Sequence, residues 1–184
     1  MKIKDYKINL QNLLKEIGKY ENVLVTGGGK IINENKFKDV RGYRIIINSH
    51  SLDHYLNFDN IYINWNNHEM ISCNNQHKYY THKSYEGWKR LIRTINTLPR
   101  FKSDHERFVS PSTGCLALWI AINSSCKNIY IDGFDLFTNE NLEILTENTF
   151  HKFDISKKSS HDHKKEKEFI LHHSKKYNKI LFYK

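Results

Sequence analysis

The apolar segment Cys115–Ile122, in the middle of the chain, constrains the fold more than any other feature. No face of a helix formed there would carry a charged side chain, so such a helix must be buried on all sides. Ser110–Gly114 precedes it and supplies hydroxyl groups that accept hydrogen bonds from a first helical turn, which predicts an N-cap. Asn128–Ile131 follows as a short apolar strand that ends at an Asp-Gly pair. The order of buried helix and buried strand predicts an α/β domain organised around residues 107–135.

The start of this helix is a candidate anion-binding site. A helix entered through Ser-Thr-Gly presents free N–H groups and the positive end of its dipole to the space outside, and both suit a phosphate or a carboxylate. A capped core helix without a ligand has the same local sequence, because Ser and Thr are common N-caps. The segment alone does not separate these two interpretations.

Length, cysteine count and charge set the broad class. The 184 residues predict one domain, 1–184, that is large enough to bury a core. Three cysteines at unrelated spacings make neither a disulfide framework nor a zinc site, so we expect free thiols in a reducing cytoplasm. The net charge of +9 indicates attraction to polyanions. A nucleotide-sugar, an anionic membrane surface and nucleic acid all fit that charge, although no nucleic-acid-binding module is recognisable.

Hydrophobic periodicity predicts the remaining elements. Residues 6–18 form an amphipathic helix, and residues 23–26 form a buried strand followed by Gly27, Gly28 and Gly29. Further strands are expected at 44–49 and 61–65, each ending in polar residues. We therefore expect an α/β fold with a mainly parallel sheet flanked by helices, a Rossmann-like single domain.

The other segments are predicted more coarsely. Residues 66–81 are expected to form a loop or a short helix, and residues 85–98 a surface helix with Trp88 on its apolar face. The polar stretch that follows Asp135 is typical of a lid. A helix containing Phe169 and Ile170 should lead into a closing strand at 178–182.

Four blocks of the sequence resemble the motifs of one enzyme family. Pro111–Gly114, Cys126, Ile129–Ile131 and Gly133-Phe134 resemble the small sialyl motif of animal-type sialyltransferases, which form glycosyltransferase family 29. The bacterial sialyltransferases of family 42 carry a similar block. Gly27, Gly29 and Asn48 are similar to the large sialyl motif, in which Gly28 and Ile46 here replace Asn and Arg. His151–Asp154 resembles the third motif, and His161 with Glu166, spaced as His-x4-Glu, resembles the very small motif.

The resemblance implies a role for each matching residue. It implies that His161 is the general base, that His151 stabilises the leaving phosphate, and that Asn48 contacts the cytidine nucleotide. It also implies that Gly27, Gly28 and Gly29 lie beside the nucleotide, and that the anion is bound by Ser112, Thr113 and Gly114. Histidine suits a base because its pKa lies near neutrality. The family needs neither a divalent metal nor another cofactor, in keeping with the lack of a DxD motif here.

The implied activity is that of an inverting, metal-independent glycosyltransferase. It would transfer sialic acid from CMP-sialic acid to a hydroxyl of a glycan or glycolipid acceptor, on a sialyltransferase-type variant of the GT-A fold. The short chain and the lack of a cysteine near residues 23–24 differ from the animal enzymes, and we expect a compact cytoplasmic microbial or viral relative, with peripheral contact at the inner membrane face as a further option. Two alternatives stay open: a transferase for another CMP-sugar, such as that of Kdo, or another nucleotide-dependent enzyme on this fold; and a non-catalytic domain that binds nucleic acid or anionic glycan.

Overall fold

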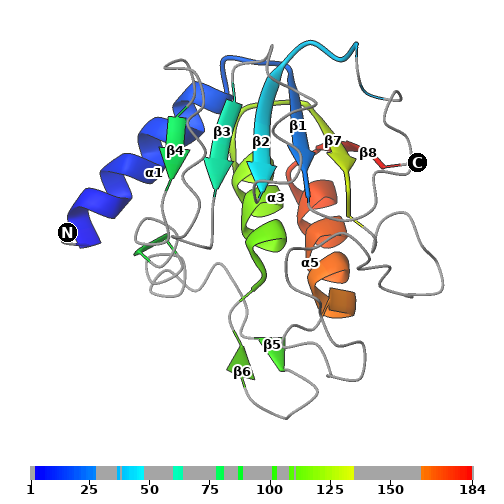
Figure 1. Cartoon of the computed structure of the whole chain (residues 1–184). Helices are drawn as coiled ribbons and strands as arrows, with labels where there is room; N and C mark the ends of the chain where they lie inside the picture. Colours follow the sequence, from blue (N-terminus) through cyan, green and yellow to red (C-terminus); the bar gives the residue numbers. More distant parts are fainter. Residues whose placement is uncertain are drawn as a thin grey trace, which may run out of the picture.

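The sheet and its helices are seen in a computed structural model, which describes residues 3–27, 37, 39–47, 60–63, 78–80, 87–88, 101–102, 108–109, 111–134 and 163–183. The main sheet has six strands in the order β4-β3-β2-β1-β7-β8, and every pairing within it is parallel (Figure 1). Its strands are β1 (Asn22–Thr26), β2 (Tyr43–Ile47), β3 (Asn60–Ile63), β4 (Lys78–Tyr80), β7 (Asn128–Asp132) and β8 (Ile180–Phe182). The predicted α/β arrangement with a mainly parallel sheet is confirmed.

The two central strands, β1 and β2, are buried along almost their whole length. Every residue of β2 is buried, and so is every residue of β1 after Asn22. Parallel sheets are covered on both faces, so their strands consist of nearly continuous β-branched and apolar residues rather than alternating ones. This explains why Val23–Thr26 and Arg44–Ile47 could be recognised as strands from short runs of Val and Ile.

Three helices lie behind the sheet in the view of Figure 1: α1 (Ile3–Ile17), α3 (Thr113–Asn123) and α5 (His163–Lys176). Alternate strand residues, among them Val23, Ile45 and Ile129, join these helices in one apolar core. The middle helix, α3, contacts both α1 and α5. The carboxyl ends of the strands and the first turns of α3 and α5 lie at the same edge of the sheet (Figure 1).

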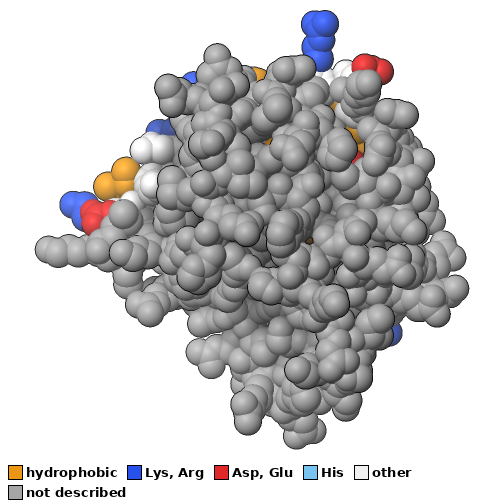
Figure 2. Space-filling model, viewed as in Figure 1, with side chains coloured by type: hydrophobic (Ala, Val, Ile, Leu, Met, Phe, Trp, Pro, Cys, Tyr) orange, Lys and Arg blue, Asp and Glu red, His pale blue; other side chains and the backbone are white. Residues whose placement is uncertain are grey.

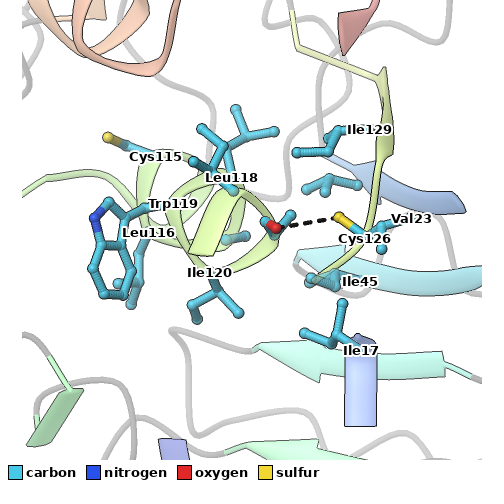
Figure 3. Packing of buried hydrophobic residues seen from close by; sticks show 14 of the residues in the cluster. Ile17, Val23, Ile45, Cys115, Leu116, Leu118, Trp119, Ile120, Cys126 and Ile129 are labelled. Atoms are coloured by element: carbon cyan, nitrogen blue, oxygen red, sulfur yellow. Dashed lines mark hydrogen bonds between the residues drawn. The ribbon is translucent and has the colours of Figure 1, made fainter. Parts of the chain in front are cut away.

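The helix α3 is buried on all sides, as its composition predicts. Every residue from Cys115 to Ile122 is buried. Figure 3 shows side chains leaving the helix in several directions, with Ile45 and Ile129 among the residues packed around it. Ser112 is the N-cap, and its hydroxyl oxygen accepts a hydrogen bond from the N–H of Cys115 at 3.1 Å. The predicted helix and its cap are confirmed.

The helix α1 is amphipathic and lies at the rim of the layer. Leu10, Leu13 and Ile17 are buried, whereas Lys4, Lys7 and Lys15 are exposed. In Figure 2, basic, acidic and apolar side chains gather at the rim of the molecule where α1 lies. This helix covers one margin of the core.

Two expectations need correction. Lys78–Tyr80 forms the edge strand β4, where a loop or a short helix was predicted, because three residues are too few for an alternating pattern to be visible. A separate antiparallel pair, β5 (Phe101–Lys102) with β6 (Phe108–Val109), was not predicted at all.

Of the helix predicted at 85–98, only Gly87 and Trp88 are described; both are helical, and Trp88 is fully buried. The predicted lid after Asp135 lies outside the described residues. No helix in the described ranges is long and apolar enough to cross a membrane.

Candidate functional site

The candidate site lies where β1 and β7 end side by side. Thr26 and Asp132 are register partners at the carboxyl ends of these strands. In the sheet, β2 lies on the outer side of β1, and β8 lies on the outer side of β7. The strand order therefore reverses between β1 and β7. In open parallel sheets, ligands bind outside the carboxyl ends of the strands at such a switch point.

Two glycines bring the chain segments after these strands into direct contact. The N–H of Gly27 donates to the carbonyl oxygen of Asp132 at 2.8 Å, and the N–H of Gly133 donates to the Asp132 carboxylate at 2.9 Å. A Cβ added at Gly27 would lie 2.5 Å from the carbonyl oxygen of Gly133, which itself has a φ of +64°. The close approach at Gly27 is therefore made to another backbone segment, and glycine is required there whether or not a ligand binds.

The ring of Phe134 joins this contact to the start of α3. A Cβ added at Gly27 would lie 3.0 Å from the ring, and one added at Gly114 would lie 2.5 Å from it. The ring thus fills the space that these two glycines leave open. The ring therefore contacts both the residue that follows β1 and the first turn of α3.

A carboxylate from a distant part of the chain already occupies the start of α3. The N–H and the hydroxyl group of Ser112 donate to the two carboxylate oxygens of Glu166, each at 2.6 Å. Glu166 is only 3% exposed and belongs to the first turn of α5. The anion that suits this helix start is thus supplied, at Ser112, by the protein itself.

The first turn of α3 has two further backbone N–H donors, those of Thr113 and Gly114. Among the described residues, no hydrogen bond engages the N–H of Thr113 or of Gly114. Both residues are partly exposed. The first N–H groups of a helix have no partner within the helix, so these two can serve a ligand. At the start of α3, the donors open to an anion among the described residues are therefore the N–H groups of Thr113 and Gly114, because both donors of Ser112 are in use.

The electrostatics of the site also define the state of Cys115. Burial raises the pKa of the Cys115 thiol well above its usual value, and the negative charge of Glu166 raises it further. The thiol therefore stays protonated near neutral pH, and a protonated thiol is a poor nucleophile. This cysteine belongs to the core of α3 and is not a catalytic group.

The structure brings together four of the nine residues predicted for the site: Gly27, Ser112, Thr113 and Gly114. The other five lie outside the described residues: Gly28, Gly29, Asn48, His151 and His161. Among the described residues, no three His, Cys, Asp or Glu side chains are grouped as metal ligands.

Sequence reasoning assigned no role to Phe134 or Glu166, although both belong to the quoted motifs. Their contacts with Gly114 and Ser112 join separate blocks of the chain, and a single sequence carries no signal for such pairs. Comparison with known proteins finds no family model, no characterised protein and no solved structure that matches this chain.

Proposed function

We propose that this protein is an inverting, metal-independent glycosyltransferase that transfers a sialic acid-type sugar from a CMP-activated donor to a glycan hydroxyl. The observation that carries the proposal is the meeting of three of the quoted motifs at one edge of the sheet. Gly27 comes from the block similar to the large motif, Gly114 and Phe134 from the small motif, and Glu166 from the very small motif. The resemblance was drawn from the sequence alone, and the meeting of the blocks in space supports it.

The donors that remain at α3 suit the substrate of such an enzyme. CMP-sialic acid carries a carboxylate on the sugar and one phosphate, and either can accept hydrogen bonds from the N–H groups of Thr113 and Gly114. In this proposal Ser112 acts through Glu166 instead of touching the substrate.

The chain links the proposed base to the start of α5. His161 is two residues before His163, the first residue of α5, and two residues can span at most about 7 Å. In the proposed reaction the imidazole of His161 takes the proton of the acceptor hydroxyl. The hydroxyl oxygen attacks the anomeric carbon, the bond to the phosphate oxygen breaks, and CMP leaves while His151 stabilises its charge.

A non-catalytic role in binding a polyanion is the second candidate. It is favoured by the exposed lysines on α5, which are Lys164, Lys165, Lys175 and Lys176. DNA binding that falls steeply with added salt, without any binding of CMP, would support this role over the enzyme.

The deciding experiment is a thermal-shift titration with CMP in the presence of EDTA. At about 100 times its Kd, CMP should add roughly 2.7 kcal/mol of stability, and UMP and AMP should add much less. A Gly114→Ala variant, in which the added methyl group crowds the first turn of α3, should show a smaller CMP shift. No shift with CMP would contradict the proposal, and a shift that EDTA abolishes would contradict its metal-free form.

A further inference from the structure

We infer that Glu166 is a positioning residue, whose carboxylate fixes the start of α5 against the start of α3. His161, the base of the proposed function, precedes the first residue of α5 by two residues in the sequence. The inference rests on the proposed function where it names His161 as the base. The anchoring itself rests only on the contacts of Glu166.

The geometry of the contact defines both position and orientation. Both carboxylate oxygens of Glu166 are engaged by one residue, Ser112, which lies 54 residues away in the sequence. Two hydrogen bonds to two separate donors restrict the rotation of the carboxylate as well as its distance. Charge-assisted hydrogen bonds of this length are the strong ones.

The charge of Glu166 is matched to its surroundings. A buried carboxylate is costly unless donors and positive charge surround it. Glu166 lies in the first turn of α5 and at the N-cap of α3, and each helix N-terminus carries about half a positive elementary charge. One carboxylate therefore serves two helix starts. Glutamine has nearly the same shape but no charge, and its second terminal atom is an NH₂ donor, so it cannot reproduce the charge-assisted bond on each of two oxygens.

A loose α5 start would affect the reaction more than the binding of the nucleotide. The N–H groups of Thr113 and Gly114 belong to α3, which stays in the core. The proposed base, His161, is instead linked to the start of α5 through a single intervening residue of the chain. Misplacement of a reacting group by about 1 Å can cost about 100-fold in rate.

The test compares Glu166→Gln with Glu168→Gln, an exposed glutamate on the same helix that serves as the matched control. For Glu166→Gln we expect kcat to fall about 10–100-fold while KM for the CMP-sugar changes less than about threefold. Ser112→Ala removes one of the two bonds and should act in the same direction. Ser112→Thr keeps both donors, so its kcat should stay near that of the wild-type protein. The kcat of the Glu168→Gln control should also stay near the wild-type value.

Amide hydrogen exchange tests the anchoring without relying on the activity. Glu166→Gln should speed exchange in the first turn of α5, and Glu168→Gln should not. Unchanged exchange in Glu166→Gln would overturn the inference, as would an unchanged kcat or a kcat lost equally in Ser112→Thr. A wild-type protein without transfer activity would contradict the proposed function, and the exchange data would still decide whether Glu166 anchors α5.

Discussion

Lys179 donates its ammonium group to the carbonyl oxygen of Ser124 at 2.7 Å, at the end of α3 opposite to the one that Glu166 occupies. A second bond joins the same ammonium group to the carbonyl oxygen of Cys126. The helix α3 thus has a carboxylate at its positive end and an ammonium group at its negative end. Both groups come from the C-terminal segment 166–179.

The ammonium contact makes Lys179 a stability residue. Lys179→Met keeps most of the side-chain volume but leaves the two carbonyl oxygens without this donor. Hydrogen bonds to charged groups contribute about 1.5–3 kcal/mol each, so we expect the free energy of unfolding to fall by roughly 2 kcal/mol. Urea denaturation measures this change, with the exposed Lys175→Met as control. Equal stability of the two variants would show that the contact contributes nothing.

Gly114→Ala tests whether Phe134 requires a glycine at the start of α3. In a helix, alanine is favoured over glycine by about 1 kcal/mol. Here the added methyl group would lie 2.5 Å from the Phe134 ring, and overpacking of this kind costs about 1–3 kcal/mol. We expect a net loss of stability in chemical denaturation, and partial recovery when Phe134→Leu is added. A more stable Gly114→Ala variant would contradict the close packing.

Cys115 should make stability fall at alkaline pH. Its pKa is raised in the folded state by burial first and by Glu166 second, so the folded thiol holds its proton at pH values where the unfolded thiol loses it. The resulting stabilisation is complete below the unfolded pKa of about 8.5 and is lost as pH rises above it, with a slope of at most about 1.4 kcal/mol per pH unit. Denaturation of Cys115→Ala between pH 7 and 10 should show a shallower slope. Identical slopes would remove Cys115 as the cause.

Thiol titration complements this measurement. Cys115 and Cys126 are free and buried, so both should react slowly in the folded protein. In denaturant we expect all three cysteines of the chain to react as free thiols.

The two histidines of the proposed reaction should differ in their effects. His161→Ala should lower the rate of transfer by about 10²–10⁴, as expected for loss of a general base, with little change in CMP affinity. His151→Ala should slow transfer through poorer stabilisation of the leaving phosphate and weaken CMP binding as well. Steady-state kinetics and calorimetric CMP titration separate the two. Near-normal turnover in His161→Ala would show that the base is another residue.

The parts of the fold that depend on local sequence could be predicted, whereas contacts between distant segments could not. Cys115–Ile122 had to be a buried helix because it has no polar face, and Ser112 could cap it because the hydroxyl and the N–H of Cys115 are three residues apart. The strand β4 was missed because its three residues carry no periodic pattern. The glycine at 27 was recognised, but the sequence could not show that its neighbour is Gly133.

The candidate site likewise has features that the local sequence predicts and features that depend on contacts between distant segments. The N–H groups at the start of α3 follow from the helix itself, and a single sequence predicts them. The occupation of Ser112 by Glu166 depends on how α5 packs on α3, and no pattern within either segment encodes it. For this reason Ser112 was expected to bind the substrate, although its two donors are already used within the protein.

The placement of both partners of α3 in segment 166–179 also affects the order of events during synthesis. A growing chain that has emerged only as far as Phe134 contains the whole of α3 but neither Glu166 nor Lys179. Its most apolar helix would then have an unneutralised dipole at both ends and lack the cover that α5 provides. Closing contacts over more than fifty residues is slow compared with local helix formation. The uncovered apolar helix of the partly made chain therefore offers a surface to which a chaperone or an aggregating neighbour can bind.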